Sequence, residues 1–116
     1  MTNKNYVSGT YYERKTVNLL RDQGFHAQRT AGSHGLFDVI AVGHGQVRLI
    51  NIKKGYWPPP KERAEFYWLE VPVMNVDYFL DRLCNPLGPI FLEIWRWDKG
   101  AKEPQIRYEN DWSKND

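Results

Sequence analysis

The sequence has little cysteine and no long hydrophobic run, and both shortages restrict what the chain can be. Cys84 is the single cysteine of 116 residues. An intramolecular disulfide and a zinc site built on cysteines are therefore excluded. No apolar run approaches membrane-spanning length, and no charged-then-apolar leader opens the chain. We expect an intracellular, cytoplasmic protein in a reducing compartment.

The composition is that of one folded domain over residues 1–116, with 41% hydrophobic and 26% charged residues. The net charge of +2 hides an asymmetry. Through residue 63 there are ten basic against four acidic residues, and the remainder holds six basic against ten acidic. A basic half is typical of a protein that binds a phosphate backbone. Ordinary surface variation explains the charge alone equally well.

Two short apolar runs, residues 36–42 and 47–53, are rich in β-branched residues and predict adjacent strands. Gly43-His44-Gly45 joins them and suits a tight hairpin turn. A two-residue turn at His44-Gly45 would pair Asp38 with Asn51, both on one face. Because side chains alternate along a strand, Lys53 joins them there.

An acid, an amide and an amine thus meet at the end of an otherwise hydrophobic hairpin. Polar groups in such a place are unfavourable unless they have partners, which makes Asp38, Asn51 and Lys53 a candidate site. Taken alone, so short a pattern is more often a buried ion pair or a pair of exposed strand ends.

The first half predicts a helix from Ser8 or Thr10 to about Asp22, opened by a Thr10–Glu13 capping box and ended by Gly24. Its buried stripe would place Glu13 at the edge of the buried face. An acid in a first helical turn usually serves the helix dipole. A strand over residues 25–29 and a loop over 30–35 follow.

After Lys53 the sequence predicts an extended linker at Pro58-Pro59-Pro60 and a helix from Pro60 or Lys61 to about Leu69. A helix over 76–84, a strand over 90–97, a turn at 98–100, a strand over 105–108 and a polar tail complete the chain. This order predicts an α/β fold with a mixed central β-sheet flanked by helices.

An Asp, a dozen residues, then an acidic residue-x-Lys on a second strand is the signature of the PD-(D/E)xK nuclease superfamily. Within it the chain most resembles the archaeal-type Holliday junction resolvases, and its shortness suggests a phage or viral version. The resemblance implies a restriction-endonuclease-like αβββαβ core. The matching pieces are Ser8-Gly9, Glu13-Arg14, Gly24-Phe25, Arg29 with Ala31-Gly32-Ser33, residues 37–41 and Ile50-Asn51-Ile52-Lys53.

The resemblance implies metal-dependent cleavage of four-way DNA junctions, with Mg²⁺ as the ion and Mn²⁺ as a substitute. Asp38, position 51 and the carbonyl of Ile52 would hold the metal, and Glu13 would complete the site. Lys53 would orient or deprotonate the attacking water, and Ser33 would lie near the scissile phosphate.

Asn51 departs from the pattern, because the family has Glu there. An amide oxygen can ligate a metal but carries no negative charge. Three explanations stand side by side: the family member tolerates Asn, the chain binds junctions without cutting them, or the residue is a deliberate inactivating substitution.

Sequence-independent contacts to DNA are expected from basic residues around this site. The candidates are Lys4, Arg14, Lys15, Arg29, Lys54, Lys61 and Arg63, with His34 touching phosphate. The resolvases are homodimers, as a two-fold substrate requires. Phe91, Trp95 and Trp97 exceed what one small sheet face needs to bury, which favours a dimer interface there.

Junction cleavage is the first hypothesis. The alternatives are a nuclease of the same fold acting on another DNA structure, a junction-binding protein without activity, and a small protein-interaction domain. Comparing cleavage of a four-way junction with cleavage of its linear arms distinguishes junction cleavage from activity on another DNA structure. The last predicts no salt-dependent DNA affinity.

Overall fold

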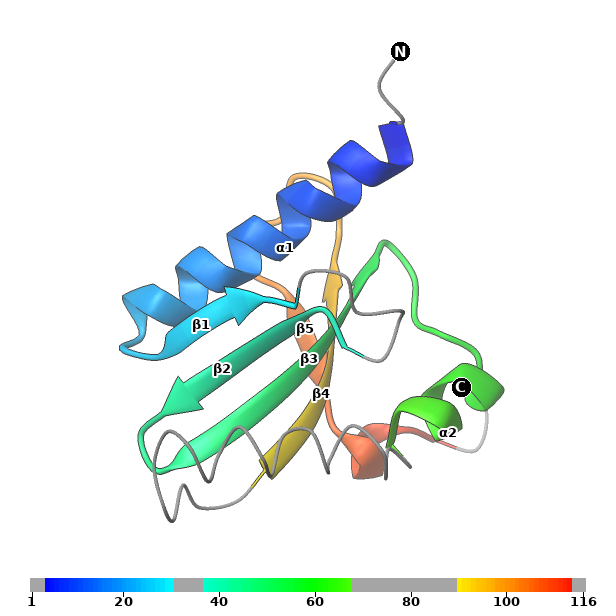
Figure 1. Cartoon of the computed structure of the whole chain (residues 1–116). Helices are drawn as coiled ribbons and strands as arrows, with labels where there is room; N and C mark the ends of the chain where they lie inside the picture. The colour runs from blue at the N-terminus through cyan, green and yellow to red at the C-terminus, as the bar shows by residue number, and fades with distance from the viewer. Residues whose placement is uncertain (1–3, 31–36, 68–89, 114–116) are drawn as a thin grey trace.

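The computed structural model describes residues 4–30, 37–67 and 90–113, with side chains from Thr10 onward. Five strands form one sheet in the order β1-β2-β3-β4-β5. The expected helix over 76–84 and the loop of small residues lie outside the described part. The elements, shown in Figure 1, are α1 (Lys4–Asp22), β1 (His26–Arg29), β2 (Val39–Gly43), β3 (Gln46–Lys54), α2 (Pro60–Tyr67), β4 (Ile90–Trp97), β5 (Gln105–Arg107) and the short 3₁₀ helix η1 (Glu109–Asp111).

The sheet is mixed, because β3 and β4 run parallel while the other neighbouring pairs are antiparallel. A parallel pair needs a long crossover, which here contains α2. The predicted mixed sheet with flanking helices and its αβββαβ order are confirmed.

The β2–β3 hairpin has the predicted register, with Val39 opposite Ile50 and Gly43 opposite Gln46. His44 and Gly45 form the two-residue turn with φ of 50° and 73°. Positive φ at both turn positions matches the right-handed twist of the strands, and glycine adopts it without strain. The turn therefore sets which side chains of β3 share a face with those of β2.

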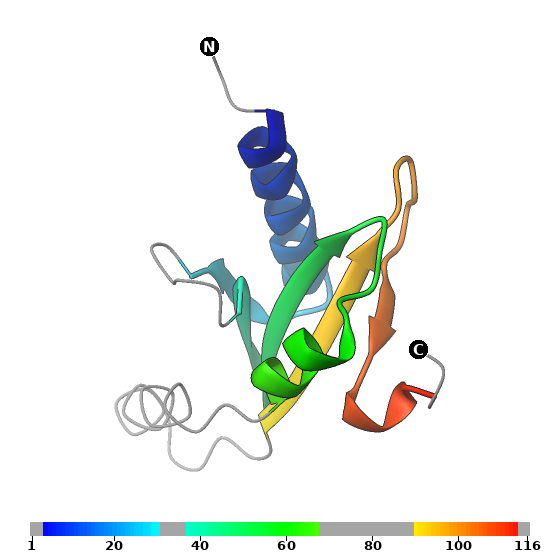
Figure 2. The same cartoon turned by 90° about the vertical axis from the view of Figure 1, so that its right-hand side faces the viewer.

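The two helices cover opposite faces of the sheet (Figure 2). On the α1 face, Val17 and Leu20 pack against Ile50 and Trp95. On the other face, Phe66 of α2 packs against Ile94 of β4. Alternate residues of β4 therefore serve different layers, as the two-residue period of a strand requires.

Helix α1 begins at Lys4, so Thr10 lies inside it and the predicted capping box is wrong. The same correction removes the dipole explanation for Glu13, which is far from the first turn. The predicted end is confirmed: Gly24 has φ of 93°. The N–H of Phe25 donates to Leu20 O at 3.0 Å, the closing bond of a Schellman motif.

Trp95 and Trp97 are both buried beneath α1, so their proposed use in a dimer interface is wrong. Helix α1 covers the two tryptophans, and Trp97 Nε1 donates to Thr16 Oγ1 at 2.8 Å. The strands predicted at 90–97 and 105–108 are present, the second ending one residue early at Arg107. Within the predicted polar tail, Trp112 Nε1 donates to the Tyr67 hydroxyl at 3.0 Å.

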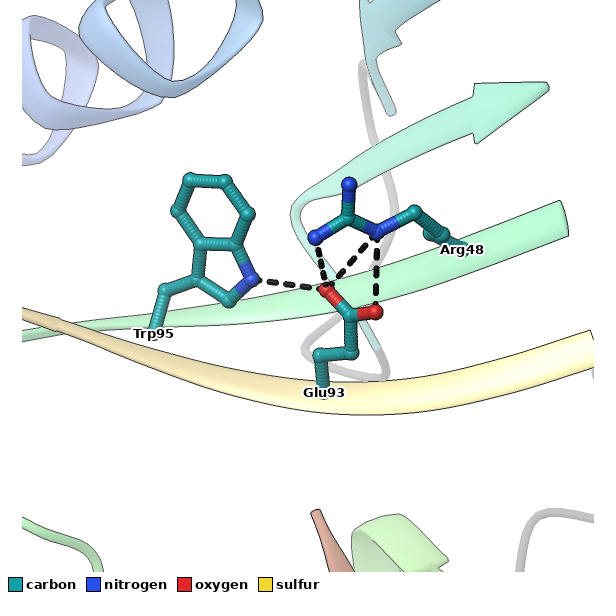
Figure 3. Close-up of polar contacts among 3 residues, drawn as sticks. All are labelled: Arg48, Glu93 and Trp95. Carbon is teal, nitrogen blue, oxygen red and sulfur yellow. Dashed lines mark hydrogen bonds and ion pairs between the residues drawn. The ribbon is translucent and has the colours of Figure 1, made fainter. Parts of the chain in front are cut away.

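A buried ion pair joins β3 to β4 on the α1 face. Arg48 donates from Nε to Glu93 Oε2 at 2.8 Å and from Nη2 to Oε1 at 2.9 Å. Trp95 Nε1 donates to the same carboxylate at 2.8 Å (Figure 3). Tyr108 adds a further hydrogen bond, so Glu93 is fully engaged by its neighbours. No described helix is both long and apolar enough to cross a membrane.

Candidate functional site

Asp38 lies one residue before the start of β2. Its N–H donates to Ile50 O at 2.7 Å, and its carbonyl accepts from Thr30 N–H at 3.0 Å. Its carboxylate Oδ2 accepts from the N–H of Ile52 at 2.7 Å. The Asp38 carboxylate thus accepts a hydrogen bond from β3 that a backbone carbonyl would otherwise accept. Its second oxygen lies at the end of the hairpin.

Asn51 is buried at 8% exposure, and its Oδ1 has no hydrogen-bond partner among the described residues. An unsatisfied buried acceptor costs about 1–3 kcal/mol. Side chains of β3 alternate, so Asn51 and Lys53 share the face opposite α1. An oxygen without a donor, next to Asp38 in the register, is suited to a cation.

Lys53 forms an ion pair with Glu62 in the first turn of α2. The Lys53 side chain is only 14% exposed, whereas that of Glu62 is 42% exposed. The Tyr56 ring lies 5.7 Å from Lys53 Nζ. The ammonium is close enough to Asp38 to lower the pKa of that carboxyl, so Lys53 acts electrostatically on both carboxylates.

The two predicted acids of the site each have a raised pKa. Burial raises the pKa of Asp38 above its ordinary value, opposed by the Ile52 hydrogen bond and by Lys53. Burial, and then the charge of Asp38, raise the pKa of Glu13, opposed by Arg29. Arg29 Nη2 lies 3.3 Å from Glu13 Oε2. The mutual repulsion means that α1 brings Glu13 within electrostatic reach of Asp38.

No three His, Cys, Asp or Glu side chains gather as a metal-holding group within residues 4–30, 37–67 and 90–113. The oxygens available at the end of the hairpin are two carboxylates and the Asn51 amide. Hard divalent cations accept amide and carbonyl oxygens and keep several waters. The orphaned Oδ1 and the two desolvated carboxylates fit such an ion, with less negative charge than a site carrying Glu at position 51.

The predicted DNA-contacting residues differ in their exposure and in whether they already interact with other residues of the chain. Arg14 and Lys61 are exposed. Lys15 donates to Ala101 O at 2.7 Å and lies over the Trp97 ring. Arg63 donates to Pro58 O at 3.1 Å and stacks on an aromatic ring.

Arg29 forms an ion pair with Glu13, and Lys54 also has an interaction within the chain. Ser33 and His34 lie outside the described residues, as does the Lys4 side chain. The structure therefore leaves the roles of these residues in DNA binding as predictions.

Sequence reasoning missed Glu62. Nothing in its spacing from Lys53 indicates contact, because the proline run and a change of direction separate them. The only available signal was its place in the first turn of a predicted helix, which is also where acids stabilise helices.

Two comparisons with known proteins found matches. Residues 4–58 match the family model described as archaeal Holliday junction resolvase (Hjc). No curated protein matches the chain.

Among solved structures, the chain is similar to Hjc, a Holliday junction resolvase from the archaeal hyperthermophile Archaeoglobus fulgidus. The TM-score is 0.58 at 17% identity, covering 87% of this chain and 72% of that one. At this identity the structural likeness speaks for the fold. The sequence of residues 4–58 is thus similar to the archaeal Holliday junction resolvases, and the chain shares the fold of one of them.

Proposed function

We propose that this chain is a divalent-metal-dependent endonuclease that cleaves four-way DNA junctions. The observation that carries the proposal is the buried Oδ1 of Asn51, which no described residue satisfies, on the same face as Asp38 and Lys53 and within the residues that match the resolvase family. The metal is proposed to be Mg²⁺, with Mn²⁺ as a substitute.

Asp38, the Asn51 amide oxygen and the carbonyl of Ile52 are the proposed metal-holding groups, completed by Glu13. A divalent ion bound there would neutralise charge on the scissile phosphate and favour hydroxide at neutral pH. Both carboxyls have a raised pKa. Metal binding should therefore strengthen as pH rises through those values, because only the ionised carboxylates attract the cation.

Lys53 is the proposed group that orients the attacking water. Its side chain is nearly buried and held from α2, which limits the directions its ammonium can take. Ser33 is proposed to contact the phosphate. The expected place of action is the cell compartment that holds the DNA.

Branched DNA is proposed to be bound through phosphate contacts, because no base-reading element is needed to recognise a shape. Exposed Arg14 and Lys61 are the best placed for this role. His34 belongs to the same proposed set, together with four residues that already hold partners within the chain: Lys15, Arg29, Lys54 and Arg63. A homodimer would match the two-fold symmetry of the substrate.

The second candidate is a junction-binding protein that does not cut. Asn51 favours it, since loss of one carboxylate weakens a hard-cation site. In that case the raised pKa of Asp38 and the buried amide would be remnants of a site that once held metal.

The decisive test is cleavage of a labelled four-way junction in Mg²⁺ and Mn²⁺, by this chain and by Asn51→Glu, with binding followed in EDTA. We expect both to bind the junction more tightly than duplex, and Asn51→Glu to cut at least about tenfold faster, because it adds a carboxylate to the site. Cutting by Asn51→Glu alone would favour the binding-only candidate. If neither prefers the junction over its linear arms, the proposed function is wrong.

A further inference from the structure

The negative charge missing from position 51 has a counterpart on α2. Lys53 Nζ pairs with Glu62 Oε1, although the two residues lie on different elements. Lys53 also acts on Asp38, whose pKa it lowers. Arg29 already pairs with Glu13, so without Glu62 the Lys53 ammonium would offset the charge of Asp38, a poor environment for a divalent cation.

We propose that Glu62 is a positioning residue of the metal site, which offsets the charge of Lys53 and so compensates for Asn51. The inference rests on the proposed function, because it concerns the same metal. It does not require Glu62 to ligate the ion directly, and no three acids of the described residues form such a group. Glu62 acts through Lys53: it holds the ammonium and restores the net negative charge around Asp38.

A purely structural reading of Glu62 exists, since an acid in a first helical turn is stabilised by the helix dipole. Two observations oppose it as a full account. The side chain reaches back to β3 instead of facing solvent alone, and its partner Lys53 is only 14% exposed. The same face of β3 also carries the buried Oδ1 of Asn51, for which the described part of the chain provides no hydrogen-bond partner. A merely stabilising role would not make Glu62 sensitive to the residue at position 51.

The test measures Mn²⁺ affinity of the metal-stripped full chain by electron paramagnetic resonance of free Mn²⁺, without DNA. We expect Glu62→Gln to weaken Mn²⁺ binding about tenfold. This is the smaller end of the effect known for residues that contact metal ligands, because Glu62 is partly exposed. Glu65→Gln is the matched control: it makes the same change at an exposed site on the same helix, and should stay within about twofold of the wild type. Thermal unfolding verifies that each variant is folded.

The double variant Asn51→Glu/Glu62→Gln is the sharper measurement. If the two carboxylates compensate for each other, it should regain about the wild-type affinity. Unchanged affinity in Glu62→Gln, or no recovery in the double variant, overturns the inference. A wild-type chain that binds no Mn²⁺ overturns it as well.

The proposed function is tested separately by junction binding of the wild-type chain in EDTA, where no metal contributes. Loss of junction preference in the wild type would reject the function. Normal junction cleavage together with unchanged Mn²⁺ affinity in Glu62→Gln would reject the role of Glu62 only.

Discussion

Strand β3 carries one ion pair on each face, and the two pairs differ in how completely neighbouring donors and acceptors satisfy them. On the α1 face, Glu93 accepts hydrogen bonds from Arg48, Trp95 and Tyr108. On the α2 face, the pair of Lys53 and Glu62 lies beside an amide oxygen with no partner among the described residues.

The contrast separates a polar group that holds two strands together from one that we propose to be functional. Each pair joins a basic residue of β3 to a glutamate of another element, so the presence of an ion pair does not separate them. What separates them is the balance of donors and acceptors. A saturated network holds β3 against β4, whereas an unsaturated one retains the capacity to bind something further.

The largest effect should come from breaking the saturated pair. Glu93→Gln leaves Arg48 buried without a counter-charge, and we expect a loss of about 3–5 kcal/mol in the free energy of unfolding. Urea denaturation measures it. The control is Asp98→Asn, which breaks the more exposed pair with Arg96 and should cost under about 1 kcal/mol. Equal losses in the two variants would show that the Arg48 pair has no special structural role.

A smaller change in the free energy of unfolding, of opposite sign, should come from Asn51 on the α2 face. Asn51→Leu replaces the orphaned amide by an apolar side chain of similar size, and should stabilise the metal-free chain by about 1 kcal/mol. Thermal unfolding in EDTA measures it. The same substitution should abolish the stabilisation that added Mn²⁺ gives the wild type. A destabilised Asn51→Leu would mean that the amide has a favourable role without metal.

The smallest effect concerns Asp38 and pH. Because its pKa in the folded chain is raised above the ordinary 3.8, the folded state binds the proton more tightly than the unfolded state. Stability from this group is thus present at low pH and falls as pH rises through the raised pKa. Asp38→Asn should remove that fall, so its melting temperature in EDTA should gain a few degrees on the wild type as pH rises above about 4.

The control for Asp38→Asn is Glu103→Gln, which removes an exposed carboxylate and should show no such gain. The amide oxygen that Asp38→Asn introduces can still accept from the Ile52 N–H, so the comparison isolates the charge. A difference between Asp38→Asn and wild type that does not change with pH would contradict the raised pKa.

Much of the architecture followed from local pattern. The alternation of β-branched residues and the glycine turn specified the β2–β3 hairpin, and with it the common face of Asn51 and Lys53. The eight-residue strand β4 and the glycine end of α1 were equally local. Such features are readable because they depend on neighbours within a few residues.

The start of α1 was misjudged for the same reason. The capping pattern at Thr10 is a local signal, but the helix continues back to Lys4. Position within the helix then decides what Glu13 does, since the dipole acts only near an end. The helix instead brings Glu13 within reach of Arg29 and Asp38, which lie at the neighbouring ends of strands β1 and β2.

The sequence by itself determined the family motif, the hairpin register and the absence of a carboxylate at position 51. Only the tertiary structure decided that Trp95 and Trp97 are covered by α1, that the Asn51 oxygen is left without a partner among the described residues, and that Glu62 meets Lys53. The reason is physical: period and turn chemistry act along the chain, whereas burial, desolvation and ion pairing depend on which elements pack together.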